Sequence, residues 1–379
     1  MRYLFSIILI LQILQIVLPM RKSHFRKLHI RRLRKYCCLP QKLQQVPLAE
    51  ESGMLLAVRN ITIPGYPHAY NPSIVQGVDG FHLAFRFDIK SSPLPYGRNF
   101  SSYIGMTALD KNFHPKGYAT VLDTSSEFSE DPRCTYVGDD CYLLFNDSSE
   151  YSSTRDFRSM RLAQIDLSRY KLKTLQNLDI QMQPIEKNWI PFAASDEEGT
   201  KLFLSYTINP HKVFKLFNPA GNKLEHLSLN QLSWIDNPWE KEWGILRGGT
   251  PAILLDNEYL SFFHSRFVDI QTNLVWYVMG AYTFASLPPF ELTSISAHPI
   301  LFHGIYQTTV HNTISSHLRC IYPSGIVLGK EGDKEIIYVA CGENDRAIKI
   351  LTFDKKKLLS SLIPLNRKSS DIVVYEEAL

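Results

Sequence analysis

Asp131-Pro132-Arg133-Cys134-Thr135 is one of five segments of this chain in which a proline opens a short strand of small or apolar residues. Turn residues and then a second, aromatic strand follow each segment, as a β-hairpin requires. The five prolines are spaced 60, 59, 60 and 72 residues apart and are Pro72, Pro132, Pro191, Pro251 and Pro323. Five hairpins at nearly one period predict five structural units of the same kind.

A period of about 60 residues is too long for a helical or leucine-rich solenoid. Four-stranded sheets repeated around an axis leave only short, protected edges, and five such sheets form a β-propeller. We therefore predict an all-β fold, a five-bladed β-propeller preceded by an N-terminal hydrophobic and basic leader. The blades are predicted at about residues 60–120, 121–180, 181–240, 241–310 and 311–365.

The leader is the least globular part of the chain. Residues 3–20 are almost uninterruptedly apolar, and residues 1–40 hold nine Lys and Arg but no Asp or Glu. The apolar run is barely long enough to span a bilayer. Because eight basic residues follow the run and only one precedes it, a membrane anchor is favoured over a cleaved signal peptide, and a basic leader without a membrane role is the remaining alternative. The positive-inside rule places the body on the cytoplasmic side, whereas signal cleavage would leave it secreted or lumenal.

The chain is accordingly divided into an anchor or signal (residues 1–20), a basic linker (21–55) and a catalytic propeller (56–379). Of 41 basic and 37 acidic residues, 32 basic and all 37 acidic residues lie after residue 40, which gives this part a net charge of −5. Nucleic-acid binding needs a basic face, so we expect no nucleic-acid partner. The 45% hydrophobic content supports a large core and excludes disorder.

Cysteines and glycosylation motifs leave the compartment undecided. Cys134 and Cys141, and likewise Cys320 and Cys341, are placed to face one another across hairpins, but buried free thiols are expected for them. Three sequons begin at Asn60, Asn99 and Asn146. A chain of this length contains a few by chance.

The innermost strand of each propeller blade lines the central channel, so the residue before each repeat proline is predicted to point into one shared pocket. Proline at a strand start costs no ladder hydrogen bond, which explains the prolines without any function. It does not explain the polar residues that gather just before them. The five predicted pocket residues are Asn71, Asp131, Ile190, Thr250 and Tyr322, with Glu130, Lys187, Asn188 and Arg247 immediately upstream.

Glu130-Asp131-Pro132-Arg133 carries the strongest chemical signal. Burial in a narrow channel raises the pKa of a carboxyl and suits it to general-acid work, whereas an adjacent arginine lowers that pKa. The alternative is a surface ion pair within a turn.

At these motifs the sequence resembles the β-mannoside phosphorylases, family 130 of the glycoside hydrolases, and related mannosyltransferases, over about residues 65–350. The resemblance implies that Asp131 is the proton donor. It also implies that Lys187, Arg247 and His264 contact phosphate, and three cations from three blades would hold an anion through charge-assisted hydrogen bonds. Tyr206 departs from the pattern, because some phosphorylases have a further phosphate-binding arginine there. The expected substrate-binding residues are Asn71, Arg86, Asp88, Glu130, Arg133, Asn188, Tyr206 and Asp345.

The expected reaction forms or breaks a β-mannosidic bond with inversion, by phosphorolysis or by transfer from a sugar phosphate. An oligosaccharide or sugar phosphate is the expected substrate and inorganic phosphate the co-substrate, with no cofactor and no metal. An inverting hydrolase is the first alternative; its base would be Glu343 or Asp345, at a carboxyl separation of about 6.5–9.5 Å. A catalytically silent glycan-binding propeller is the second. Arabinan-cleaving propellers are disfavoured because they carry an acidic residue where Asn71 stands.

Four tryptophans lie close to these motifs in the sequence. Their rings would either stack on sugar faces or fill the core, and the sequence favours neither. They are Trp189, Trp234, Trp239 and Trp243.

Overall fold

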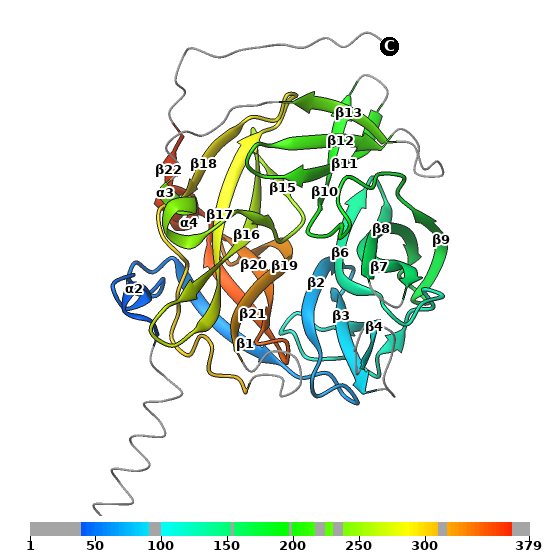
Figure 1. Ribbon diagram of the computed structural model, residues 1–379, viewed down its shortest axis with the longest axis horizontal. Coiled ribbons are helices and arrows are strands. Elements are labelled where there is room, and N and C mark those ends of the chain that lie inside the picture. The colour runs from blue at the N-terminus through cyan, green and yellow to red at the C-terminus, as the bar shows by residue number, and fades with distance from the viewer. Residues whose placement is uncertain are drawn as a thin grey trace, which may run out of the picture. The chain divides into compact units, whose positions relative to one another are not determined.

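The computed structural model describes residues 39–90, 100–152, 155–196, 199–216, 224–229, 238–309 and 317–365, and strands dominate them. The chain divides into two compact units, Met1–Gln45 and Val46–Leu379. The first unit contributes helix α2 (Gln41–Gln44), and the described strands all lie in the second (Figure 1). The predicted all-β class is confirmed.

Three four-stranded antiparallel sheets are each built from strands that follow one another in the chain. Consecutive antiparallel strands need only short turns, in agreement with the predicted hairpins. The first sheet consists of β2 (Tyr70–Gly77), β3 (Gly80–Lys90), β4 (Phe100–Leu109) and β5 (Thr120–Val121). The second consists of β6 (Glu130–Val137), β7 (Asp140–Ser152), β8 (Arg155–Asp166) and β9 (Lys171–Asn177), and the third of β10 (Ile190–Asp196), β11 (Gly199–Thr207), β12 (Lys212–Leu216) and β13 (Leu224–Leu229).

A ten-stranded sheet contains two further groups of consecutive strands, which a short parallel pairing of β17 with β19 joins. One group is β14 (Arg247–Gly248), β15 (Ile253–Leu255), β16 (Glu258–Asp269), β17 (Leu274–Ala285) and β18 (Leu292–Ser296), with β22 (Leu362–Pro364) at its edge. The other is β19 (Leu318–Glu331), β20 (Lys334–Glu343) and β21 (Ala347–Asp354), which β1 (Leu55–Ile61) completes. Helix α3 (Pro238–Trp243) precedes β14, and α4 (Lys355–Ser361) follows β21.

At three of the five repeat prolines the pairing of the inner strand is irregular, whereas Pro191 lies in the regular ladder of β10 and Pro251 lies between β14 and β15. The ladder register shifts between Tyr70 and Ser73 in β2, between Glu130 and Arg133 in β6, and between Pro323 and Gly325 in β19. A bulge needs no donor from the proline nitrogen and turns the neighbouring side chain out of the regular alternation. Pro72, Pro132 and Pro191 therefore lie at strand starts, as predicted, and the bulges of β2 and β6 set the directions of Asn71 and Asp131. The prediction of a strand start is wrong at Pro323, which lies inside β19, and at Pro251, which lies between two strands.

Hydrogen bonds join the inner strands of different sheets. The Ser73 hydroxyl accepts from the Cys134 amide at 2.8 Å, and the Ser324 hydroxyl donates to the Pro72 carbonyl at 2.6 Å. The Ala252 amide donates to the Pro191 carbonyl at 3.1 Å. The Pro72 segment is thus bonded directly to the Pro132 and Pro323 segments, and the Pro191 segment to the Pro251 segment.

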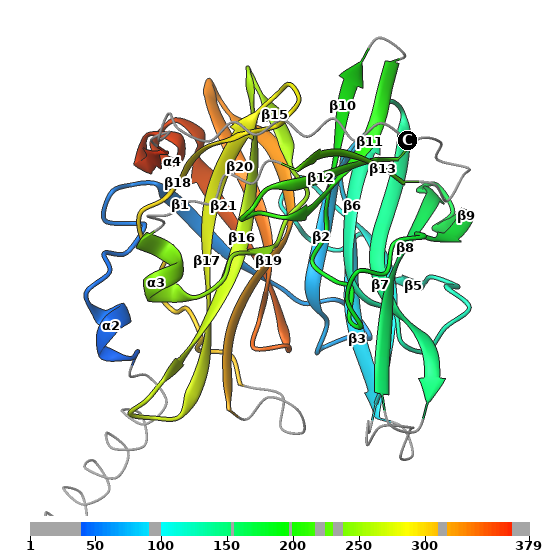
Figure 2. The ribbon, with the colours of Figure 1, turned by 45° about the horizontal axis from the view of Figure 1, so that its top comes forward.

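Apolar layers fill the space between neighbouring sheets. The first and second sheets lie side by side in Figure 2. Between them, Met106 of the first sheet packs with Leu143 and Phe145 of the second. Leu144, on the other face of the second sheet, packs with Leu204 of the third. The alternation of side chains along β7 therefore feeds two separate cores, since successive residues of a strand point to opposite faces.

The predicted anchor (residues 1–20) and most of the predicted basic linker (21–55) lie outside the described residues, as do Cys37, Cys38 and Asn99. In the described part of the chain, no helix has the length and apolar character needed to cross a membrane.

The four described cysteines are free and buried, which confirms the expectation of free thiols at Cys134, Cys141, Cys320 and Cys341. Asn146 is also buried, and its amide donates to the Glu130 carbonyl at 3.2 Å, so the folded chain does not present this sequon to solvent.

Candidate active site

Three predicted site residues share an unusual backbone conformation just ahead of or at the start of inner strands. Asn71, Asp131 and Asn188 have φ angles of 45°, 57° and 66°. Non-glycine residues rarely adopt positive φ, and such strain concentrates at functional sites, where the fold maintains it. At Asn71 and Asp131 the strained backbone coincides with the bulges of β2 and β6.

Asp131 is bound by side chains from the first sheet. The Asn71 amide donates to Asp131 Oδ1 at 2.8 Å, and Arg86 Nη1 lies 3.4 Å from the same oxygen. Gly342 makes the position of Asn71 possible, because a Cβ at residue 342 would lie 2.2 Å from Asn71 Oδ1. Asn71 Oδ1 itself is buried without a hydrogen-bond partner among the described residues.

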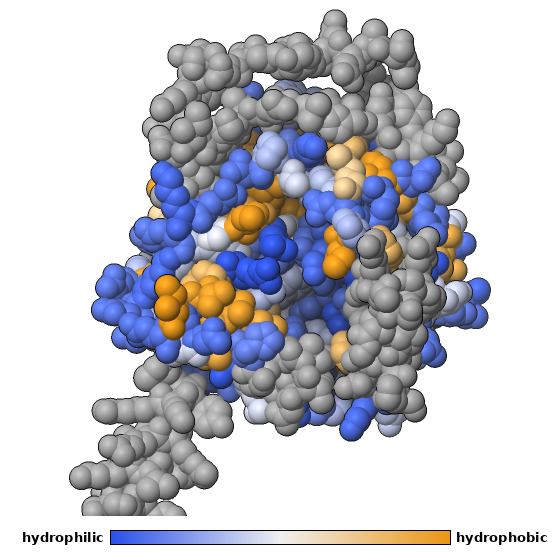
Figure 3. Space-filling model, in the orientation of Figure 1, coloured by the Kyte–Doolittle hydropathy of each residue, from blue (hydrophilic) through white to orange (hydrophobic). Residues whose placement is uncertain are grey.

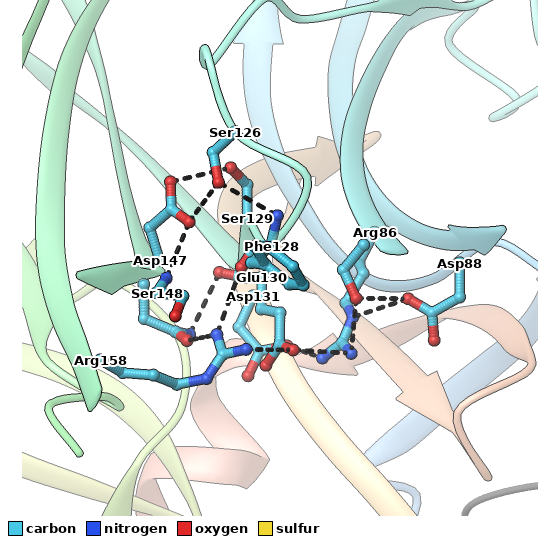
Figure 4. A network of polar contacts seen from close by, with 12 residues as sticks. Arg86, Asp88, Ser126, Phe128, Ser129, Glu130, Asp131, Asp147, Ser148 and Arg158 are labelled. Atoms are coloured by element: carbon cyan, nitrogen blue, oxygen red, sulfur yellow. Dashed lines mark hydrogen bonds and ion pairs between the residues drawn. The ribbon is translucent and has the colours of Figure 1, made fainter. Parts of the chain in front are cut away.

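Arg86 connects Asp131 to two further carboxylates. Its Nη2 lies 3.1 Å from Glu130 Oε1, and its Nε lies 3.2 Å from Asp88 Oδ1. The Tyr70 hydroxyl donates to Asp88 Oδ2 at 2.6 Å, and its ring lies against the guanidinium. Figure 4 shows Arg86 pointing toward Glu130 and Asp131 on one side and toward Asp88 on the other.

The net effect on Asp131 is a lowered pKa. Burial is the largest influence and raises the pKa, but the Arg86 charge, the Arg133 charge, the hydrogen bond from Asn71 and the Lys187 charge together outweigh it. The cations therefore overcome the desolvation expected of a channel carboxyl. In this state of the protein Asp131 is a carboxylate at neutral pH.

Two of the predicted cations lie opposite each other on paired strands, Arg247 of β14 facing His264 of β16. Burial lowers the pKa of His264 well below its usual value, and the charges of Arg133, Arg247 and Lys187 lower it further. Arg247 Nε and His264 Nδ1 are both buried without a hydrogen-bond partner in the described part of the chain. Arg247 Nε is a donor, and His264 Nδ1 is one when it carries the ring proton, so together they can bind an anion.

Lys187 interacts electrostatically with both the cations and the carboxylates. The residue is exposed to solvent, yet desolvation by the surrounding protein lowers its pKa. The charges of Asp131 and Glu130 oppose that shift, while those of Arg158 and Arg247 add to it. The charge of Lys187 therefore interacts both with the carboxylates Asp131 and Glu130 and with the cation Arg247.

Asp345 belongs to the same neighbourhood. It follows β20 with a φ of 52°, and its charge contributes to raising the pKa of Tyr70 and of Cys320. The charge of Asp131 also raises the pKa of Cys320. Around the middle of the face seen in Figure 1, where β2, β6 and β19 lie, Figure 3 shows hydrophilic residues gathered at a hollow.

Three solved structures share this architecture with the chain. A glycoside hydrolase from Parabacteroides distasonis, described as putative, has 14% identity and a TM-score of 0.54, over 85% of this chain and 98% of that one. A β-1,2-mannobiose phosphorylase from Listeria innocua has 15% identity and a TM-score of 0.52, over 85% of this chain and 96% of that one. A mannose phosphorylase from Leishmania mexicana, solved with a phosphate ion, has 13% identity and a TM-score of 0.52, over 84% of this chain and 95% of that one. The chain has the fold of the mannoside phosphorylases.

No family model matches the sequence, and neither does any curated protein. The resemblance to mannoside phosphorylases inferred from the sequence motifs is therefore confirmed at the level of the fold. Sequence identities of 13–15% leave activity and substrate to be argued from the site itself.

Within the mannoside phosphorylase fold, Arg133 is not placed as the substrate-binding residue that was expected. Its side chain is wholly buried, and its donors bind protein groups: the carbonyls of Asp131, Gly248 and Gly249 and the Tyr322 hydroxyl. The prediction is corrected, because the bulge in β6 directs Asp131 toward Arg86 and Arg133 toward the interior between the sheets.

Ile190 and Thr250 were predicted to point into the pocket, and the burial of their side chains corrects both predictions. Ile190 is fully buried in β10, and Thr250 is fully buried with its hydroxyl accepting from the Phe262 amide at 2.9 Å. Tyr206, expected to bind substrate, packs with Trp189 in the apolar layer between the second and third sheets, and its hydroxyl donates to Glu186 at 3.3 Å. Of the five predicted pocket residues, Asn71 and Asp131 contact each other, and Tyr322 reaches Arg133 and Asn188.

The tryptophans are core residues where they are described. Trp189, Trp239 and Trp243 are buried, and Trp234 lies outside the described residues. Two of the buried indole N–H groups have partners inside the protein: Trp189 donates to Glu186 at 3.2 Å and Trp239 donates to the Ser265 hydroxyl at 2.8 Å.

Glu343, one of two candidate bases for hydrolysis, is fully buried. It accepts hydrogen bonds from the Tyr306 amide at 2.7 Å and from the amide and hydroxyl of Thr308, and it lies 3.4 Å from Lys349 Nζ. Both carboxylate oxygens accept bonds from the chain segment before β19, so the prediction of a catalytic base is corrected to a structural anchor.

The sequence reasoning missed Arg158 and Tyr70. Arg158 of β8 binds Glu130 Oε1 at 2.7 Å and the Asn146 side chain at 2.5 Å, as Figure 4 shows. Tyr70 directly precedes Asn71 in the proline segment, so its position was a usable signal. Arg158 gave none, because only the pairing of β7 with β8 brings it beneath Glu130.

Proposed function

We propose that this protein is a carbohydrate-active enzyme that breaks or forms β-mannosidic bonds with inversion, by phosphorolysis or by transfer from a sugar phosphate. Asp131 is the general acid in this proposal. Lys187, Arg247 and His264 hold the phosphate, and Asn71, Arg86, Asp88, Glu130, Asn188 and Asp345 surround the sugar. We also infer that the five groups of strands are the blades of a propeller, the last of which β1 completes.

The observation that carries the proposal is the coupling of one strained carboxylate to Lys187 and Arg247, beside which the neutral ring of His264 also has a nitrogen that is unbonded among the described residues. Asp131 is bound by Asn71 and Arg86, and its charge acts on Lys187, which is in turn affected by Arg247. Arg247 Nε and His264 Nδ1 lack acceptors within the described residues. This combination of a carboxyl and an anion site is what phosphorolysis requires.

The chemistry follows from the two halves of the site. A phosphate oxygen forms a bond to the anomeric carbon while the glycosidic carbon–oxygen bond breaks, and a proton passes to the departing oxygen. In the free protein the charges of Arg86, Arg133 and Lys187 keep Asp131 ionised. A bound phosphate offsets their charge and favours the protonated carboxyl, so anion binding prepares the acid for its role.

Hydrolysis is an outcome of the same test. With Glu343 occupied as an anchor, Asp345 is the remaining carboxyl from the sequence analysis that could serve as a base toward water. If the protein cleaves a β-mannoside without phosphate, and Asp345→Asn abolishes that cleavage, the reaction is hydrolysis and not phosphorolysis.

The decisive assay incubates the purified full chain with mannose-1-phosphate and a panel of sugar acceptors and measures released phosphate. We expect release that Asp131→Asn lowers by at least about a hundredfold, because loss of a general acid costs about 10²–10⁴ in rate. Asp140→Asn is the matched control, since Asp140 is a half-exposed aspartate in the turn of the same hairpin. Equal activity in the Asp131 and Asp140 variants would refute the role of Asp131. Glycan binding without turnover of any linkage would instead identify a silent binding protein.

A further inference from the structure

The buried guanidinium of Arg133 binds groups from three separate parts of the fold. Its Nε donates to the Gly249 carbonyl at 2.7 Å, and its Nη2 lies 3.3 Å from the Gly248 carbonyl. Nη2 also donates to the Tyr322 hydroxyl at 2.6 Å, and Nη1 to the carbonyl of Asp131 at 3.1 Å. β6 is thereby joined to β14 and β19 through one side chain.

Tyr322 extends these contacts to the segment before β10. Its hydroxyl accepts from Arg133 and donates to Asn188 Oδ1 at 2.9 Å. Its ring lies 4.6 Å from the ring of His264. Asn188 directly follows Lys187, and Gly248 directly follows Arg247. Each of the three predicted phosphate-binding residues, Lys187, Arg247 and His264, is therefore in contact with Arg133 or Tyr322 or next to a residue that is.

The surrounding backbone is built for this close approach. A Cβ at Gly248 would lie 2.0 Å from the Asn188 carbonyl oxygen, and a Cβ at Gly249 would lie 2.4 Å from the Phe262 carbonyl oxygen. Both positions therefore require glycine. The carbonyls that Arg133 binds are those of these two glycines, Gly248 and Gly249. A planar fork of donors can hold several fixed carbonyls at once, which a lysine cannot do.

Joining strands through a buried charged side chain costs free energy. Removing a guanidinium from water costs free energy that hydrogen bonds to neutral groups recover only in part, and apolar side chains can fill the same volume without this cost. Arg133 therefore contributes specific geometry in addition to packing.

We propose that Arg133 and Tyr322 form a positioning relay, which sets the separation between Asp131 and the proposed anion-binding residues Lys187, Arg247 and His264. The inference rests on the proposed function, since it assigns to the relay the geometry that phosphate transfer needs. Neither residue contacts the substrate; both act through the backbone and side chains that they hold.

The test compares two buried tyrosines in the full-length protein. Tyr322→Phe removes the hydroxyl that joins Arg133 to Asn188. Tyr259→Phe is the matched control, because the buried Tyr259 also spends its hydroxyl on a bond between sheets, to the Ala193 carbonyl at 2.7 Å, with no link to the relay. We expect inorganic phosphate to bind at least about tenfold more weakly to Tyr322→Phe than to Tyr259→Phe in calorimetry, since a hydrogen bond to a charged group contributes about that much. Similar unfolding midpoints in the two variants would show that stability is not the cause.

A second measurement follows His264 directly by NMR titration of its imidazole. In Tyr322→Phe the loosened ring admits water beside His264, so the pKa of His264 rises, whereas in Tyr259→Phe it stays at the wild-type value. Equal phosphate affinities in the two variants would overturn the relay.

The two proposals fail in different ways. If the wild-type protein binds no phosphate, the proposed function is wrong, and the titration then decides the relay alone. An unchanged His264 pKa in Tyr322→Phe would in that case overturn it.

Discussion

At the scale of single residues, two opposing influences set the ionisation of Asp131. Burial favours the neutral carboxyl, whereas Arg86, Arg133, Asn71 and Lys187 favour the charged one and prevail. A carboxyl with a lowered pKa stabilises the fold at pH values above its unfolded pKa of about 3.9, and that contribution is lost as the pH falls through the folded pKa. The acid of the proposed reaction is therefore ionised until a bound anion changes its surroundings.

Arg86→Gln tests this balance. The substitution removes the largest influence that lowers the pKa of Asp131, so we expect that pKa to rise toward or above its ordinary value. Carbon-13 NMR titration of the aspartate carboxyls measures the change. Arg161→Gln is the control, because Arg161 forms a comparable ion pair with Asp147 at 2.8 Å and is not among the groups that shift the pKa of Asp131. An unchanged Asp131 titration in Arg86→Gln would contradict the assignment.

At the scale of strands, the approach of β20 to β2 decides where Asn71 lies. Gly342→Ala would place a methyl group 2.2 Å from Asn71 Oδ1 and 2.7 Å from the Asn71 amide nitrogen. Because backbone cannot move aside cheaply, we expect a loss of about 1–3 kcal/mol in the free energy of unfolding, as for other overpacked sites. Turnover should fall by more than the stability loss explains, since Asn71 holds Asp131.

The control for Gly342→Ala is Gly117→Ala. A Cβ at Gly117 meets no atom within 4 Å, so this variant should match the wild type in both urea denaturation and turnover. A fully active Gly342→Ala enzyme would show that the position of Asn71 is not needed.

The turn between β11 and β12 carries a histidine that links two sheets. His211 is buried; its Nδ1 lies 2.7 Å from the Phe290 carbonyl and its Nε2 lies 3.0 Å from the Ser205 hydroxyl. Burial lowers its pKa to about 4, although the bond to Phe290 opposes the shift. The unfolded chain takes up a proton below about pH 6.5 and the folded chain does not, so this residue destabilises the fold as the pH falls toward 4.

His211→Gln should reduce this acid sensitivity. Between pH 7 and pH 5 we expect the free energy of unfolding of the wild type to fall by about 2 kcal/mol more than that of the variant, at about 1.4 kcal/mol per pH unit below 6.5. Urea denaturation at the two pH values measures the difference. His114→Gln, at an exposed histidine, should keep the wild-type pH dependence.

At the scale of the whole molecule, the first strand of the chain completes the last group of strands. β1 pairs with β21 from Leu55 to Ile61, although some 290 residues separate the partners. Without β1, the edge of β21 would be unpaired, and an exposed strand edge promotes aggregation. Removal of residues 1–61 should therefore abolish cooperative unfolding or yield insoluble protein.

Removal of residues 1–45 is the matched truncation. It ends at the boundary between the two compact units and leaves β1 intact, so we expect the unfolding midpoint of the full chain. Circular dichroism during heating distinguishes the two truncations. Cooperative unfolding at the same temperature in both would show that β1 does not contribute to the stability of the fold.

The sequence by itself determined the all-β class, the five hairpins and the position of Asp131 at a strand start. These features depend on neighbours in the chain: alternating apolar residues, turn residues between them, and prolines that strand interiors exclude. The same local signals placed Asn71 and Asp131 at equivalent repeat positions, and the structure brings them into contact.

Only the tertiary structure decided which polar residues near Asp131 surround the site and which support it. Arg133 and Glu343 occur in the same motifs as Asp131 and Asp345, yet both are buried and fully engaged in holding other segments. Arg158 joins Glu130 from another strand. The physical reason is that bulges and contacts between sheets set the direction of a side chain and its burial. Those contacts join residues far apart in the chain, where no local pattern records them.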